Sequence, residues 1–97
     1  MRTSQSDRLA GSGDYPEIRI EAGSVFARAT RRDAGVVFRE MFDTPKGLRP
    51  LDNPVHAAKP ADAAKMYDWI AAHRDELVTM TAAQFRRAMA VAGIRCS

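Results

Sequence analysis

Hydrophobic and polar residues alternate with a period of two over residues 17–30, interrupted once by Gly23-Ser24. Such alternation is typical of strands with one buried face, and a Gly-Ser pair between two such runs indicates a two-residue hairpin turn. Closing the turn there sets Ile18 opposite Ala29. The other pairs that this turn implies are Glu17 with Thr30, Arg19 with Arg28, Ile20 with Ala27, Glu21 with Phe26 and Ala22 with Val25.

Residues 36–42 fit either a third strand or a helix. Helical spacing is met by Ala34, Val37, Phe38, Met41 and Phe42. The β-branched pair Val36-Val37 favours a strand instead, joined to the second strand by a four-residue loop, residues 32–35. In that register Ala29 pairs with Phe38, and Arg39 lies beside Arg28. The strand interpretation completes a three-stranded antiparallel meander over residues 17–42, although it leaves Glu40 on the apolar face.

Prolines dominate the next segment, residues 43–59, and Pro45, Pro50 and Pro54 exclude both a helix and a central strand. We therefore expect a long extended connection. Its length is typical of a segment that is functional or that packs on the core, here through Leu48, Leu51 and Val55.

Two helices are expected to follow, at about residues 60–76 and 82–92. Pro60 suits the first turn of the first helix, which can end early, at His73-Arg74, because acidic residues beyond it oppose the helix dipole. The second helix begins with a capping box between Thr81 and Gln84, and Gly93 follows it as a left-handed cap.

The fold class predicted is α+β in the order β-β-β-α-α, with both helices on one face of the meander. A single domain is expected over residues 15–97, after a polar, Gly/Ser-rich tail, residues 1–14, that we expect to be disordered. The predicted core contains Ile18, Ile20, Val25, Phe38, Phe42, Met66, Tyr67, Ile70, Leu77, Phe85 and Met89.

Composition narrows the cellular setting more than the function. The chain carries a net charge of +3, and its one cysteine, Cys96, excludes an intrachain disulfide. No apolar run approaches the roughly 20 residues of a membrane span, and no signal peptide is evident. We expect a cytoplasmic protein without a membrane partner, of bacterial or phage/plasmid type given its Ala- and Arg-rich composition.

Basic side chains carry the leading functional hypothesis, a small accessory protein that contacts nucleic acid. Arg19, Arg28 and Arg39 would form a row across one sheet face, with Arg31 and Arg32 in the adjoining loop. Because like charges set side by side are destabilising, Glu17 and Glu21 are expected to offset the row. Arg86 and Arg87, on the outward face of the second helix, form a rival basic surface.

The alternative is a protein–protein interaction module, such as an adaptor, inhibitor or assembly factor, that uses a sheet edge, the proline-rich connection or exposed apolar side chains. Trp69, Phe26 and Met41 are the candidate contacts, since tryptophan is enriched in interface hot spots. For Trp69 itself, a position at the edge of the core, covered by the proline-rich connection, is the favoured interpretation, because isolated apolar residues at such a boundary are common. The oligomeric state is left open.

Catalysis, metal and cofactor binding have little support in the sequence. His56 and His73 lack the accompanying ligands of a zinc site, Cys96 has no base near it in sequence, and no phosphate-binding glycine loop is present. The sequence therefore predicts a non-enzyme.

Overall fold

The computed structural model describes residues 15–97, which form an antiparallel sheet of four strands in the order β1-β2-β3-β4, followed by three helices. The strands are β1 (Ile18–Ala22), β2 (Val25–Ala29), β3 (Ala34–Thr44) and β4 (Gly47–His56). The helices are α1 (Pro60–Ala72), α2 (Arg74–Leu77) and α3 (Ala82–Val91). The α+β class is confirmed, whereas the meander has one more strand than expected. The predicted disorder of residues 1–14 lies outside the described residues.

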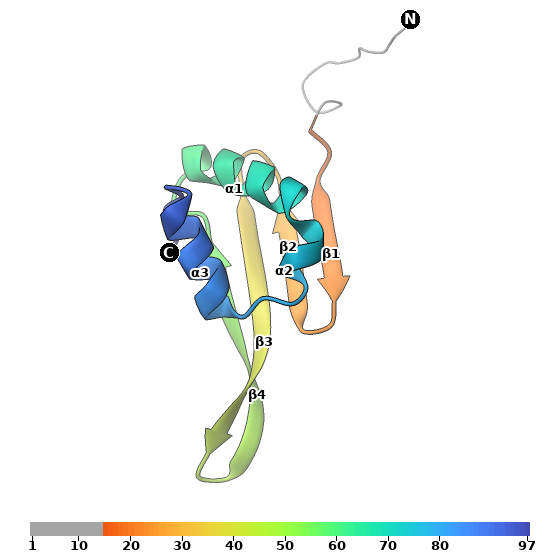
Figure 1. Cartoon of the computed structure of the whole chain (residues 1–97), viewed down its shortest axis with the longest axis vertical. Helices are drawn as coiled ribbons and strands as arrows, with labels where there is room; N and C mark the ends of the chain where they lie inside the picture. The colour runs from red at the N-terminus through yellow and green to blue at the C-terminus, as the bar shows by residue number, and fades with distance from the viewer. Residues whose placement is uncertain (1–14) are drawn as a thin grey trace, which may run out of the picture.

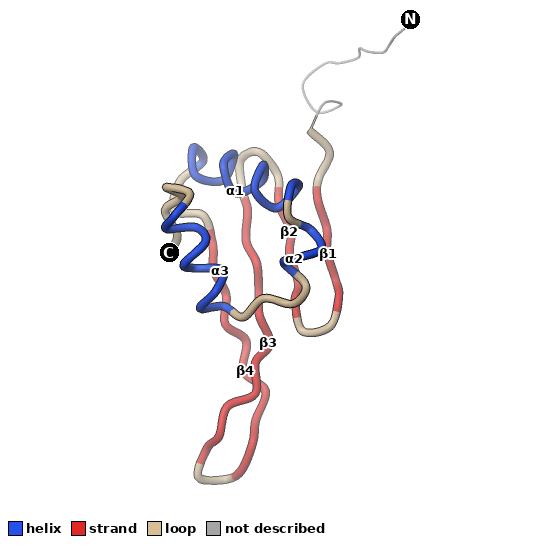
Figure 2. The backbone as a smooth tube through the Cα atoms, viewed as in Figure 1, coloured by secondary structure: helices blue, strands red, loops and turns tan. Residues whose placement is uncertain are grey.

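The helices lie on one face of the sheet, and the opposite face, which we call the open face, carries no helix (Figure 1). The ends of β3 and β4 extend beyond the helices as a two-stranded ribbon, closed by a short turn (Figure 2). We call this ribbon, residues 40–51, the arm. The molecule therefore has two distinct parts, a helix-backed body and an arm without helices.

The first hairpin forms in the predicted register, with five of the six expected pairs; the sixth, Glu17 with Thr30, lies outside β1 and β2. Gly23 adopts a φ of +59°, a backbone conformation that glycine reaches without steric cost. Ile18, Ile20, Val25, Ala27 and Ala29 consequently face the helices and are buried.

Residues 36–42 are part of a strand, as predicted, but the predicted register between β2 and β3 is wrong. Arg28 pairs with Gly35, so Arg39 does not lie beside it. The turn is the cause. Thr30 accepts a hydrogen bond on Oγ1 from the backbone N–H of Asp33 at 3.0 Å, and its own N–H donates to the Asp33 carbonyl at 2.6 Å. This closes the chain directly after β2, four residues earlier along β3 than the register that we expected.

The proline-rich segment is mostly a strand, β4, so the prediction of a long connection is wrong. β4 is at the edge of the sheet, where prolines are tolerated if their missing N–H would point outward. The N–H of His56 donates outward to Ser97 O at 3.4 Å, and Pro50 and Pro54 share its orientation because they precede it by even numbers of residues. Neither proline therefore removes a hydrogen bond to β3.

Helix limits agree with the capping signals. The capping box of α3 forms, with Gln84 N–H donating to Thr81 Oγ1 at 3.2 Å and Thr81 N–H donating to Gln84 Oε1 at 3.0 Å. Gly93 follows α3 with a φ of +75°. The first predicted helix is divided at His73 into α1 and the single turn α2, so the earlier of its two expected ends is the correct one.

Glu40 was a defect in the predicted strand, and its position has a structural reason. Its Oε1 accepts a hydrogen bond from the Ala82 N–H at 3.1 Å, at the first residue of α3, and its Oε2 accepts one from Asn53 Nδ2 at 3.3 Å. A carboxylate at this end of a helix satisfies an N–H without an intrahelical partner and complements the helix dipole. Glu40 therefore fixes the start of α3 over β3 and β4.

The core lies between the sheet and the helices and contains ten of the eleven predicted residues. Phe42 is the exception. It lies on the arm, two residues after Glu40, which marks the position of the start of α3 over β3, and 39% of it is exposed. Opposite Val25, where the predicted register placed Phe42, the structure has Phe38. Val36, which the predicted core omitted, is completely buried, as is Val55.

We predict that Glu40→Ala lowers the free energy of unfolding by about 1–2 kcal/mol, since it leaves a partly buried helix N–H without its charged acceptor. Urea denaturation measured by circular dichroism tests this. The matched control is Glu76→Ala, an exposed glutamate of α2, which should change stability by less than about 0.5 kcal/mol. Equal effects of the two substitutions would contradict the capping role.

Candidate functional site

One row of cross-strand neighbours on the open face contains Arg19, Arg28, Gly35 and His56, contributed by β1 to β4 in turn. The predicted row of three arginines is therefore replaced by two arginines, a glycine and a histidine. Arg39 lies farther along β3 and pairs with Asp52 of β4. The difference follows directly from the earlier closure of the turn between β2 and β3.

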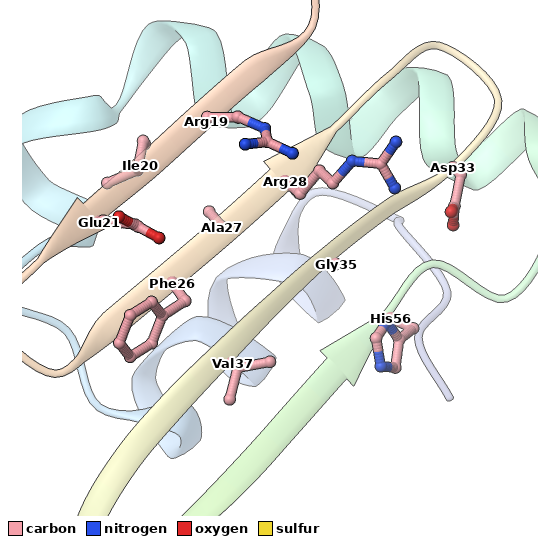
Figure 3. A pocket seen from close by; sticks show the side chains of 10 residues that line it. All are labelled: Arg19, Ile20, Glu21, Phe26, Ala27, Arg28, Asp33, Gly35, Val37 and His56. Atoms are coloured by element: carbon pink, nitrogen blue, oxygen red, sulfur yellow. The ribbon is translucent and has the colours of Figure 1, made fainter.

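A depression of about 490 Å³ is centred on this row. Figure 3 shows the Arg19 and Arg28 side chains over one part of it, the His56 ring on the far side, and the backbone of Gly35 between them. Phe26 and Val37 add an apolar wall. The other lining residues are Ile20, Glu21, Ala27 and Asp33.

Gly35 forms the floor of the depression because it has no side chain. A Cβ atom at this position would lie 2.9 Å from Cε1 of His56 and closer still to its Nδ1. The imidazole thus occupies the space above the glycine backbone. Since His56 is exposed, its ring can move if that space is filled.

Glu17 joins the two arginines of the row. Its carboxylate accepts a hydrogen bond from Arg19 Nε at 2.7 Å and another from Arg28 Nη2 at 3.3 Å. These bonds, the one from Arg19 first, hold the pKa of Glu17 below its ordinary value. Glu17 therefore performs the charge compensation that we expected of Glu17 and Glu21 together.

Two other predicted site arginines also have carboxylate partners. Arg39 Nε donates to Asp52 Oδ1 at 3.0 Å, and this bond raises the pKa of Arg39. Arg31 Nη1 donates to Asp68 Oδ1 at 2.8 Å, and its guanidinium lies 4.4 Å from the centre of the Tyr15 ring. Arg31 consequently ties the turn before β3 to α1.

The rival basic surface on α3 lies on the helix side of the sheet, away from the open face (Figure 1). Arg86 Nη2 donates to the Pro54 carbonyl at 3.1 Å and contacts Asn53 Oδ1 at 3.5 Å, so this side chain binds the edge of β4. Arg87 is exposed on α3, and Arg32 is exposed in the turn before β3. The predicted basic residues are thus spread over both sides of the sheet.

Trp69 packs at the edge of the core. Its ring contacts Phe85 edge-on, with centroids 5.5 Å apart, and stacks on His73 at 4.3 Å. His73 Nδ1 lies 2.8 Å from the Trp69 carbonyl, which fixes this stacking. The neighbours are therefore helical residues, in place of the proline-rich cover that we expected.

Apolar side chains lie on the open face of both the body and the arm, and the Arg39–Asp52 pair separates the two groups. We call them the apolar stripe: Phe26, Val37, Met41, Leu48, Pro50 and Pro54. Exposure reaches 60% at Met41 and 68% at Leu48. Of these residues, Phe26 and Met41 are predicted from the sequence, whereas the β4 members are not. The sequence signal for these residues is their spacing: Leu48, Pro50 and Pro54 are separated by even numbers of residues, which places them on one face of a strand.

The other face of the arm also exposes apolar side chains, Phe42 and Leu51, which pair with Arg49 and Glu40. Its charged residues are two acidic ones, Glu40 and Asp43, and two basic ones, Lys46 and Arg49, so its net charge is zero. A two-stranded ribbon with no other cover is marginally stable in water. The arm therefore combines exposed apolar surface with no excess of either charge.

Among residues 15–97, no group of three or more His, Cys, Asp or Glu is arranged to hold a metal ion. No helix within the same residues is long and apolar enough to cross a membrane. Burial raises the pKa of the Cys96 thiol, which makes it less nucleophilic at neutral pH. That the protein is not an enzyme stays a prediction.

Comparisons with models of protein families, with curated proteins and with solved structures find no match for this chain. Function therefore has to be inferred from the chemistry of the open face itself.

The Glu17 pKa leads to a prediction about acid stability. Because the pKa is lower in the folded state than in the unfolded one, the carboxylate stabilises the fold above the unfolded value, near 4.5, and this contribution is lost as the pH falls through the folded value. Glu17→Gln should therefore lower the melting temperature at neutral pH. Its difference from the wild type should shrink below about pH 4.5. The control is Glu21→Gln on β1, and a pH-independent effect of Glu17→Gln would contradict the assignment.

A second prediction concerns the floor of the depression. Gly35→Ala should retain the fold, with stability changed by no more than about 1 kcal/mol, but should displace the His56 ring. Imidazole resonances in NMR spectra measure this, with His73 as the internal reference. Unchanged His56 resonances would show that the ring does not lie over the glycine.

Proposed function

We propose that this protein is a non-enzymatic protein–protein interaction module that binds its partner through the open face and the arm. The observation that carries the proposal is the apolar stripe, which lies on both the body and the arm, on either side of the Arg39–Asp52 ion pair, without a covering element among residues 15–97. Exposed apolar patches rimmed by polar residues mark interaction sites in proteins. The sequence alone placed this alternative second because such a patch could not be located.

The charges of the open face argue in the same direction. Its strands contribute the basic side chains Arg19, Arg28 and Arg39 and the acidic side chains Glu21, Asp43 and Asp52, and Glu17 lies just before β1. A surface that binds nucleic acid is usually clearly basic, because phosphate contacts supply most of its affinity. Here Glu17 and Asp52 already neutralise part of the arginine charge, and the face carries no excess of positive charge.

The apolar stripe offers a sufficient source of binding free energy. Complete burial of one large apolar side chain contributes about 1.5–3 kcal/mol. Phe26, Met41 and Leu48 retain 40%, 60% and 68% of their exposure, so covering them recovers a substantial part of that amount for each. Arginine–carboxylate pairs around the stripe would form a polar rim, which excludes partners with the wrong charge pattern.

Affinity capture from an extract of cells that express the protein tests the proposal. We expect partners to be retained by the wild type after nuclease treatment and lost by the double variant Met41→Arg/Leu48→Arg. The matched control is Val91→Arg on α3, which replaces an apolar residue that is 85% exposed on the helix side of the sheet. Equal capture by all three proteins would contradict an interaction site on the open face.

Binding to labelled duplex and single-stranded DNA over a salt series tests the competing function. We expect weak binding that is unaffected by Arg19→Ala/Arg28→Ala. Tight binding that falls steeply with salt and is lost in that variant, but not in Met41→Arg/Leu48→Arg, would replace the proposal with nucleic-acid binding.

A further inference from the structure

We infer that the partner of the open face is a second copy of this chain, in a dimer in which the arm of each copy lies across the body of the other. This inference rests on the proposed function, because it names the partner of the same surface. In a twofold dimer each copy contributes the same patch, so the patch must be complementary to itself. The open face meets that requirement in shape, polarity and charge.

The first requirement is that the two ends of the face can exchange places. Gly35 marks the depression on the body and Asp43 lies near the tip of the arm, both on the open face of β3. The positions differ by eight (43 minus 35), or about 26 Å at 3.3 Å per residue. A twofold axis near Arg39, midway between them, places the arm of one copy over the depression of the other.

Apolar contacts follow from this arrangement. With the axis near Arg39, Met41 of one copy faces Val37 of the other, and the two apolar stripes lie against each other. Packed sheets lie about 10 Å apart, so side chains of this size can interdigitate between the two faces. The depression over Gly35 offers space for the opposing arm.

Charge complementarity supports the same pairing. The arm contributes the carboxylate of Asp43 to the open face, whereas the body row contributes the guanidinium groups of Arg19 and Arg28. Glu17 uses the Nε of Arg19 and one Nη of Arg28, and each guanidinium has five N–H donors, so donors remain for the opposing Asp43. Arg39 keeps its own partner, Asp52, close to the axis.

The area of the open face is of the order that a stable dimer interface buries on each partner. Strands lie about 4.8 Å apart, so four strands over five residues of the body and two strands over six residues of the arm project to roughly 500 Å². Side-chain relief increases this figure toward the about 800 Å² that each partner contributes to a standard interface. Two-stranded pairing through the outer edge of β4 is disfavoured, because Pro50 and Pro54 lack N–H groups there.

Sedimentation velocity and light scattering over a wide concentration range test the inference. We expect a species of twice the monomer mass of 10.7 kDa, with dissociation constants raised at least tenfold by Met41→Arg and unchanged by Val91→Arg. Circular dichroism confirms that each variant is folded. A monomer at every concentration, or a dimer that Met41→Arg does not weaken, would overturn the inference.

A charge exchange tests the geometry. Asp43→Arg and Arg28→Asp should each weaken the dimer when alone, because like charges then face each other at both ends. An equimolar mixture should restore dimerisation, since the introduced arginine of one chain faces the introduced aspartate of the other. Failure of the mixture to dimerise would overturn the proposed pairing. A strictly monomeric protein that still captures another partner through the open face would leave the proposed interaction function intact.

Discussion

The turn between β2 and β3 is the constraint on which the arrangement of this surface depends. Thr30 and Asp33 close the chain directly after Ala29, and the small side chain of Ala34 lies opposite it beneath the helices. That register sets Gly35 beside Arg28 and places Glu40 at the start of α3. It also determines where the helices stop covering the sheet, and therefore where the arm begins.

The faces of the strands were predictable because side chains alternate with a period of two, and a shift of four residues in register leaves each on the same face. Hence most predicted core residues are indeed buried, even though the predicted pairing of β2 with β3 is wrong. The first hairpin was predictable in full, since a two-residue turn admits one register. The turn that Thr30 closes has no comparable signal in the sequence. The prolines of β4 conceal a strand because proline is tolerated mainly at a sheet edge, and the local sequence does not reveal which strand lies at the edge.

The candidate site was less accessible to sequence reasoning. Arg19, Arg28, Phe26 and Met41 could be placed on one face by alternation alone. Their neighbours could not, because cross-strand contacts depend on register: His56 and Gly35 join the row only in the observed pairing. Whether an arginine has a carboxylate partner also depends on strand pairing, since Asp52 of β4 contacts Arg39 of β3 only because the two residues pair. The three arginines that the sequence predicts as a basic row, Arg19, Arg28 and Arg39, therefore all form ion pairs with carboxylates in the structure.

The prolines of β4 lower the tendency of the protein to aggregate through the edge of its sheet. A ribbon with apolar side chains on both faces and a complete edge would be a template for open-ended strand addition, the route by which cross-β fibrils grow. Pro50 and Pro54 lack N–H donors along the outer edge of β4. Arg86 donates to the Pro54 carbonyl on that edge, and the bridge between Ala57 and Cys96 follows directly after β4. The arm can thus display apolar faces while its β4 edge resists fibril growth.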